Sequence, residues 1–209
     1  VSICVFCEGE SEQAYIDFLK SEFHDVAVFK RPSSPGLFDD ADNRFKKDPG
    51  YRNYVDAIDE IWFFFDVEEK DIGNWTNRLE IIKRLRKLRK DPKIRVRLLM
   101  TTGCIEYWLM LHYRHLAPSL LTVPDKERML AQVVNMEPTY RKGNYDATAR
   151  IAQNYPTAVK NATIVLQNLL QEGMPGLEDT DERNRWLCTK CKTFSTVQEA
   201  IVFLEGLQS

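Results

Sequence analysis

The segment that most restricts the fold is the run IWFFF at residues 61–65, five consecutive large apolar side chains. An apolar run without alternation is typical of a strand that is covered on both faces. Further apolar runs lie at residues 3–7, 26–29 and 94–100, with helical spacings between them. Strands that alternate with helices predict right-handed crossovers. We therefore expect an α/β fold with a mainly parallel sheet of about four strands flanked by helices.

The connections also have recognisable patterns. The polar, proline-containing stretch 32–50 predicts a long surface loop, and a short helix is expected near residues 54–58. Apolar residues at helical spacing over residues 78–90 predict an amphipathic helix with basic outer faces. Another helix is expected from Ile105 onward.

After Pro118 the pattern is helical, which predicts a helical C-terminal annex packed on the sheet. We expect helices over residues 126–136, over 147–171 with a break at Pro156, and over 196–207. The last helix begins with Thr196-Val197-Gln198-Glu199, which fits a capping box. The predicted domains are an α/β domain over residues 1–116 and a helical region over residues 117–209.

Composition narrows the class of protein. The chain has 209 residues, of which 44% are hydrophobic, enough for one sizeable core. No run approaches the roughly 18 apolar residues of a membrane span, and no basic leader precedes an apolar signal core. These features predict a cytoplasmic protein without a membrane partner.

Five cysteines, an odd number, do not resemble a secreted disulfide framework. Cys4 and Cys7 have the spacing of a zinc knuckle, as do Cys188 and Cys191. Residues three apart on a strand point to opposite faces, so Cys4 and Cys7 are poorly placed to share one ion. Structural thiols are the favoured interpretation, with zinc as the alternative.

Acidic side chains follow three of the predicted strands. Because ligands of open parallel sheets bind outside the carboxyl ends of the strands, these side chains are expected to share one crevice. Two carboxylates about 4 Å apart repel by roughly 4 kcal/mol at an effective dielectric near 20, and a divalent cation removes that repulsion. Oxygen ligands favour Mg²⁺ or Mn²⁺. The candidate ligands are Glu8, Glu12, Asp66, Glu68 and Glu106.

A simpler explanation exists for some of these acids. Carboxylates are favoured in the first turn of a helix, and Ser11 can serve as the N-cap. That accounts for Glu10 and Glu12. It does not account for Glu8, which precedes the cap, or for the acids after two further strands.

Four motifs together resemble the RloB-like family. They are CEGESE at residues 7–12, FDVE at 65–68, TGCIEYWLMLH at 102–112 and YRKG at 140–143. They occur in the order found in the family, and the resemblance extends over nearly the whole chain. Each motif alone is weak, and their ordered combination is fairly specific.

The resemblance implies a TOPRIM-like domain, as in topoisomerases, primases and overcoming-lysogenization-defect nucleases, and a nuclease role in phage defence linked to restriction-modification. By this analogy Glu8 is the glutamate after the first strand, and Asp66 with Glu68 form the acidic pair after the third. Glu12, Glu106 and Lys142 match the added acids and the lysine. Two positions depart from the family pattern: Glu68 replaces an aspartate, and Thr101-Thr102-Gly103 replaces Ser-Asn-Pro.

A mechanism of phosphodiester hydrolysis assigns roles to these residues. Glu8, Asp66, Glu68 and Glu106 are the predicted metal ligands for one or two ions, and Glu8, Glu12 and Lys142 the predicted catalytic residues. Lys142 is equally well explained as an ordinary surface lysine when the resemblance is set aside. His112 lies about 120° around the helix from Glu106, so we expect it to pack or hydrogen-bond near the sheet.

The basic segment 78–97 holds ten Lys or Arg against two acids, a local charge of +8 within a chain of net charge −2. Such a block attracts a polyanion or simply forms a solvated helix face. The predicted contacts to nucleic acid, DNA or RNA, are Arg78, Lys83, Arg86, Lys87 and Lys90. Two other functions stay open: a catalytically inactive nucleic-acid-binding protein, and a protein-interaction subunit of a defence complex.

Overall fold

The computed structural model describes residues 1–208. Its centre is a four-stranded sheet made of β1 (Ser2–Cys7), β2 (Val28–Lys30), β3 (Glu60–Val67) and β4 (Arg95–Thr102). The strand order is β2-β1-β3-β4, and every pair of neighbours is parallel. The predicted α/β class and the parallel sheet of about four strands are confirmed.

The run at residues 61–65 forms the middle of β3, and all five side chains are fully buried. Trp62 and Phe64 belong to the core on one face of the sheet, whereas Ile61, Phe63 and Phe65 belong to the core on the other. β3 lies between β1 and β4, so its backbone is also paired on both edges. This double coverage explains why the segment has no polar alternation.

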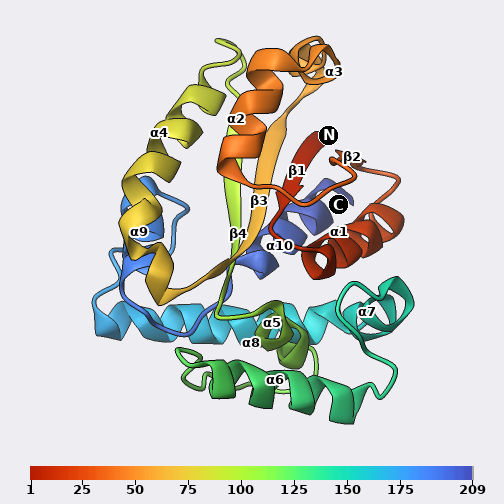
Figure 1. The fold of residues 1–209 in the computed structure, drawn as a ribbon, viewed down its shortest axis with the longest axis vertical. Helices are drawn as coiled ribbons and strands as arrows, with labels where there is room; N and C mark the ends of the chain where they lie inside the picture. The colour runs from red at the N-terminus through yellow and green to blue at the C-terminus, as the bar shows by residue number, and fades with distance from the viewer. Residues whose placement is uncertain (209) are drawn as a thin grey trace.

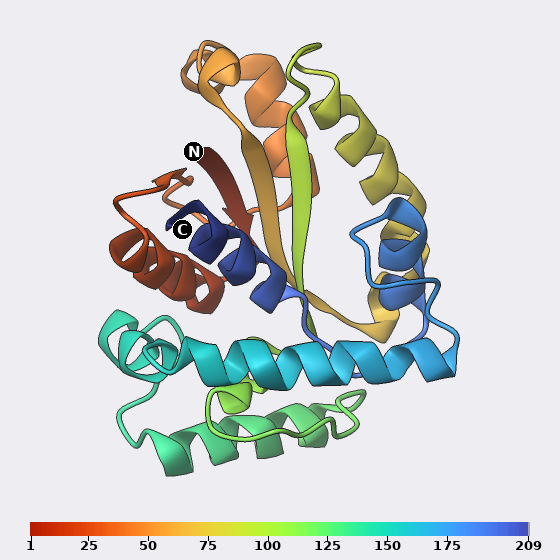
Figure 2. The same cartoon turned by 180° about the vertical axis from the view of Figure 1, so that it is seen from behind.

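Helices cover both faces of the sheet (Figures 1 and 2). One core includes side chains of α1 (Glu10–Glu22) and α10 (Val197–Gln208). The other includes side chains of α2 (Phe38–Lys47) and α4 (Trp75–Arg86). Cys4 and Cys7 fall in different cores, as expected for strand residues three apart.

A further group of helices lies beyond the carboxyl ends of the strands (Figure 1). It contains α5 (Ile105–Leu111), α6 (Val123–Met136) and α8 (Tyr155–Asn168), while α7 (Tyr145–Ala152) packs on α1 and α9 (Asp181–Thr189) on α4. The chain then returns to the sheet, where Ser195 pairs with Thr101 of β4 and α10 packs on that strand. Helix α10 therefore packs on the sheet, whereas α6 packs on α5, and the domain boundary after residue 116 stays a prediction.

The expected loop over residues 32–50 is wrong for most of its length. It contains α2 and the short helix α3 (Pro49–Arg52). Phe38, Ala41 and Phe45 recur at spacings of three and four and are buried against the sheet. The many polar residues on the outer face of α2 concealed this pattern. The expected helix near residues 54–58 is a 3-10 turn, Val55–Ala57, and two more such turns cover Glu69–Asn74 and Leu169–Glu172.

The cap expected at Ser11 is wrong, and α10 begins directly after Thr196 as expected, but the side chains of the expected capping box bind elsewhere. Gly9 is the N-cap of α1, and the Ser11 hydroxyl lies inside the helix. The hydroxyl of Thr196 donates to the Leu98 carbonyl of β4, and Glu199 binds Arg183. In each case a tertiary partner uses the side chain that the sequence pattern assigned to a cap. The break expected at Pro156 falls instead before Tyr155, with Pro156 in the first turn of α8.

No helix within residues 1–208 has the length and apolar character that a membrane span requires.

Candidate active site

Four of the five predicted acids line one crevice where β1, β3 and β4 end. The crevice has a volume of about 370 Å³, and Glu8, Asp66, Glu68 and Glu106 all border it. Glu8 follows β1, Asp66 and Glu68 come from the end of β3 and just after it, and Glu106 lies in the first turn of α5. The parallel topology brings these ends together, and Glu12 is the predicted acid that does not border the crevice. Further lining residues are Lys126, Glu127, Leu130 and Lys142.

Glu8 and Asp66 are joined directly across two strands. The backbone N–H of Glu8 donates to the Phe64 carbonyl at 3.0 Å, which extends the β1–β3 pairing by one residue. In return, the backbone N–H of Asp66 donates to Oε2 of Glu8 at 2.7 Å. This bond fixes one oxygen of Glu8 at the end of β3.

Glu12 is buried one helical turn beyond Glu8, on α1. Burial raises its pKa from 4.5 to about 7, and the negative charges of Glu8 and Glu106 contribute to this rise. A Cβ atom at Gly9 would lie 2.9 Å from Oε2 of Glu12, so the absence of a side chain at Gly9 leaves room for this carboxylate. Glu12 is therefore able to hold or release a proton near neutral pH.

Asp66 has the most strongly perturbed environment in the site. Burial raises the pKa of its carboxyl well above 3.8, and Glu12, Glu8 and Glu106 raise it further, while Lys142 lowers it. Its Oδ1 is buried and has no hydrogen-bond partner among the described residues. A buried oxygen without a partner is uncommon in folded proteins and calls for a positive group or a donor.

Glu106 is almost fully buried, and the hydroxyl of buried Tyr140 donates to its Oε1 at 3.1 Å. The Nζ of Lys142 lies 3.7 Å from the same oxygen, on a side chain that is 64% exposed. One cation therefore reaches the buried acids from the solvent side.

The loop that presents Lys142 is anchored to α1. The backbone N–H of Gly143 donates to the Ser11 hydroxyl at 3.1 Å. Gly143 has a φ of 76°, and a Cβ atom at this position would lie 3.0 Å from Cβ of Glu10. A glycine is favoured here on both counts.

Glu68 also borders the crevice, but its carboxylate is already paired with lysines. Its two carboxylate oxygens form ion pairs with Lys126 of α6 and with Lys70. Helix α6 begins with a complete capping box formed by Thr122 and Asp125, which fixes its first turn beside the crevice. Metal ligation by Glu68 stays a prediction, and it requires Lys126 to move.

The donor set suits a hard divalent cation, although no group of three or more His, Cys, Asp or Glu in residues 1–208 already has the arrangement of a metal site. The unpartnered Oδ1 of Asp66 and the shared negative field on Asp66 and Glu12 both favour a cation at this point. Glu8, Asp66 and Glu106 contribute only oxygen atoms, which favours Mg²⁺ or Mn²⁺ over softer ions. The residues therefore fit such an ion.

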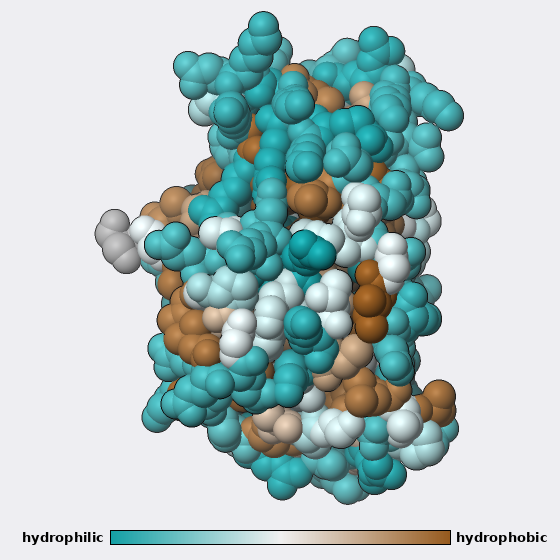
Figure 3. Space-filling model, turned by 90° about the vertical axis from the view of Figure 1, so that its left-hand side faces the viewer, coloured by the Kyte–Doolittle hydropathy of each residue, from teal (hydrophilic) through white to brown (hydrophobic). Residues whose placement is uncertain are grey.

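The predicted nucleic-acid contacts on and just after α4 lie apart from this crevice. Arg78 binds Asp71 at 3.1 Å, and Arg86 binds Asp181 at 2.8 Å and 2.9 Å. Lys83 is paired with Glu80 at 3.4 Å, and Lys87 and Lys90 are exposed. Helix α4 runs from the carboxyl end of β3 back toward the start of β4 (Figure 1). On this side of the molecule the upper half of the surface is mostly hydrophilic, with a few hydrophobic residues (Figure 3).

His112 has the structural role expected from the sequence. It is fully buried, and its Nδ1 lies 3.0 Å from the Trp108 carbonyl. A carbonyl only accepts, so Nδ1 carries the proton and Nε2 accepts from the Tyr15 hydroxyl at 3.0 Å. Burial lowers the pKa of His112 to about 4, so the ring is neutral.

The family assignment rests on nearly the full length of the sequence. The family model of the RloB-like protein matches residues 3–201. The chain belongs to this family. The match includes every acid of the crevice and Lys142. No curated protein and no solved structure matches the chain.

Sequence reasoning missed two contributors to the site. Tyr140 stands in the YRKG motif of this RloB-like chain, but its bond to Glu106 connects residues 34 apart. Lys126 lies on α6. The amphipathic pattern of this helix shows which of its sides is apolar, but it does not show which part of the protein lies next to Lys126. An aromatic residue with a polar tip directly before Arg141 and Lys142 was the available signal for Tyr140.

Proposed function

We propose that this protein is a metal-dependent nuclease that hydrolyses phosphodiester bonds of DNA or RNA. The observation that carries the proposal is Asp66, which has an unpartnered buried oxygen and a strongly raised pKa among three other acids. Acids gathered in this way are costly for stability alone and are typical of catalytic sites. The sequence resemblance to TOPRIM-type nucleases supports the same reaction.

Glu8, Asp66 and Glu106 would hold Mg²⁺ or Mn²⁺, which when bound polarises the phosphoryl group and lowers the pKa of a bound water. Oε1 or Oε2 of Glu12 accepts the proton of the attacking water, since its pKa of about 7 leaves part of the group ionised at neutral pH. The Nζ of Lys142 binds a non-bridging phosphate oxygen and stabilises the charge that develops there. Tyr140 holds Glu106 in place through its hydroxyl.

The substrate and setting follow from the same proposal. The basic residues on and after α4 attract the phosphate backbone, a contact that does not depend on sequence. A cytoplasmic role in phage defence, alongside restriction-modification enzymes and with a partner protein, is the setting implied by the resemblance.

The direct test is cleavage of plasmid DNA, single-stranded DNA and tRNA with Mg²⁺ or Mn²⁺. Glu8→Gln and Asp66→Asn are expected to lower the rate by at least about 100-fold, because each removes a ligand charge. Glu12→Gln should lower it by about 10² to 10⁴-fold through loss of the base. Glu22→Gln, at the exposed C-terminal end of α1, serves as the matched control and should cleave normally.

A second candidate is a nucleic-acid-binding protein without turnover. The ion pairs of Glu68 with Lys126 and Lys70 favour it, because they occupy both oxygens of one predicted ligand. Salt-sensitive binding of nucleic acid with no cleavage by the unaltered protein in either metal would establish this alternative. If the unaltered protein neither binds nor cleaves nucleic acid, the result favours the third hypothesis, a protein-interaction subunit of a defence complex.

A further inference from the structure

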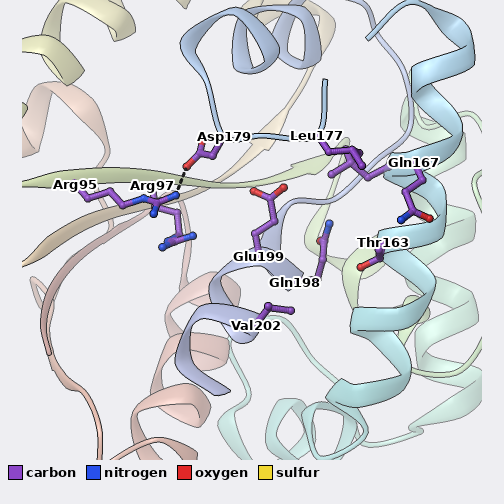
Figure 4. Close-up of a pocket in the computed structure, with 10 residues that line it drawn as sticks. Arg95, Arg97, Thr163, Gln167, Leu177, Asp179, Gln198, Glu199 and Val202 are labelled. Atoms are coloured by element: carbon purple, nitrogen blue, oxygen red, sulfur yellow. Dashed lines mark hydrogen bonds and ion pairs between the residues drawn. The ribbon is translucent and has the colours of Figure 1, made fainter. Parts of the chain in front are cut away.

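A second recess lies beside β4, apart from the crevice of the proposed active site. It has a volume of about 390 Å³, within the range of about 300 to 1,000 Å³ typical of small-molecule sites. Its walls come from β4, α8, α10 and the loop before α9 (Figure 4). It shares no lining residue with the proposed active site.

The charged groups of this recess are already neutralised. Arg97 of β4 is buried and makes a two-pronged ion pair with Glu60 at 2.9 Å and 3.0 Å. Arg95 pairs with Asp179 at 3.3 Å, drawn as a dashed line in Figure 4. Glu199 is bound by the buried guanidinium of Arg183. A ligand of this recess therefore meets no unpaired charge and is expected to be neutral.

Gln198 is the exception among the polar groups. Its residue is only 2% exposed, yet neither Nε2 nor Oε1 has a hydrogen-bond partner among the described residues. Figure 4 shows its side chain extending into the space between Glu199 and Thr163. A buried amide without partners costs free energy, so it calls for an occupant that completes its bonds.

The remaining walls are partly open and combine apolar side chains with the polar Thr163 and Gln167 of α8. Leu166 is buried, whereas Leu177 and Val202 are exposed large apolar residues, and all three border the recess. Apolar surface combined with a few placed polar groups is the usual composition of a small-molecule site. The Gln198 amide presents one donor and one acceptor side by side.

We propose that this recess binds a neutral, planar small molecule whose edge carries an acceptor beside an N–H donor, with Gln198 as the recognising residue. A carboxamide has this edge, and so does adenine at N6 and N7, the edge that glutamine reads in nucleic acids. The proposal is independent of the nuclease reaction.

The test uses the full chain, with nicotinamide and adenosine as separate probes at up to millimolar concentration. Binding is followed by calorimetry and by the side-chain amide resonance of Gln198. We expect at least one probe to shift that resonance in a saturable manner. The matched ligands N,N-dimethylnicotinamide, which lacks the donor, and 7-deazaadenosine, which lacks the acceptor, should bind at least tenfold more weakly. No saturable shift with either probe overturns the proposal.

Two variants separate recognition from structure. Gln198→Met keeps the volume and removes both hydrogen-bonding atoms, so Tm should stay equal or rise while binding falls at least tenfold. Gln171→Met, at an exposed position in the 3-10 turn after α8 and outside the recess, should bind normally. A fall in Tm of Gln198→Met by more than a few degrees would assign the amide a structural role and overturn the proposal.

A third variant tests whether the probe binds in this recess, and it leaves Gln198 unchanged. Val202→Trp enlarges a side chain that is half exposed at the recess, so the fold should be retained while the probe is excluded. Unchanged probe binding by this variant would place the ligand elsewhere and overturn the assignment.

Discussion

Asp66 and Glu12 show how one residue in the crevice depends on the others. Each carboxyl is made harder to ionise first by burial and then by neighbouring acids that come from different segments. The folded state thus binds protons that the unfolded chain releases. The charge of these two residues is a property of the site and not of the local sequence.

This coupling predicts an unusual dependence of stability on pH. The pKa of Glu12 is higher in the folded state than in the unfolded chain. The stabilisation that its protonated carboxyl gives the folded state is therefore complete below about pH 4.5 and is lost as the pH rises through about 7. Glu12→Gln should therefore raise the free energy of unfolding at pH 8 by on the order of 2 kcal/mol and flatten the slope between pH 5 and 8. Urea denaturation at several pH values without divalent ions measures both.

Glu10→Gln is the matched control for this effect, because Glu10 is an exposed acid in the same turn of α1. It should leave the slope unchanged. An unaltered slope in Glu12→Gln would contradict the assigned coupling.

Gly143 gives a second prediction at the residue scale. Its φ of 76° disfavours any L side chain, and a Cβ atom would also meet Glu10 at 3.0 Å. Gly143→Ala should lower the free energy of unfolding by more than the roughly 1 kcal/mol expected from the backbone alone. Thermal denaturation gives the value.

Gly173 provides the comparison, since its φ is 98° but a Cβ atom there would meet nothing within 4 Å. Gly173→Ala should cost the backbone contribution only. Equal losses in the two variants would show that the contact between the YRKG loop and α1 is not tight.

At the scale of elements, β4 carries two arginines on one face that differ in burial. Arg97 is buried with Glu60, whose carboxylate also accepts from the Trp62 indole at 2.6 Å. Arg95 is 51% exposed in its ion pair with Asp179. Burial thus distinguishes two ion pairs that the sequence places two residues apart.

Replacing each arginine by methionine should separate these cases. Arg97→Met leaves a buried carboxylate without its cation, so the free energy of unfolding should fall by about 3 to 5 kcal/mol. Arg95→Met should change it by less than about 1 kcal/mol. Denaturant unfolding of both proteins is the measurement, and similar losses would refute the difference in environment.

The elements also show which parts of the fold were predictable. The apolar runs at residues 3–7, 61–65 and 94–100 were identified because a strand covered on both faces requires apolar residues without interruption. Helix α2 was missed because only Phe38, Ala41 and Phe45 face the core. Helix α9 was missed because few of its residues are apolar and much of its buried face is polar, including Arg183 and Asn184.

At the scale of the molecule, charge is distributed between two regions. The acids lie beyond the carboxyl ends of the strands, whereas exposed Lys87 and Lys90 follow α4 near the start of β4. A nucleic acid that contacts both regions must extend along the side of the protein that holds α4. This arrangement makes the basic region separable from the proposed chemistry.

Reversing the two lysines should test that separation. Lys87→Glu with Lys90→Glu should weaken binding to all nucleic-acid sequences and reduce the slope of log K against log salt by about 2. Binding isotherms at several salt concentrations give the slope. Lys20→Glu, which changes an exposed lysine of α1, is the control. An unchanged slope in the double variant would remove Lys87 and Lys90 from the interface.

The sequence by itself determined the strands, their parallel connection and the set of acids that follow them, because burial and strand direction are recorded in local residue patterns. The tertiary structure decided which groups act on those acids. It placed Lys126 on Glu68, Tyr140 on Glu106 and an unpartnered amide in the recess beside β4. Such contacts join residues far apart in the chain, and their energies depend on distance and burial, which residue order alone does not specify.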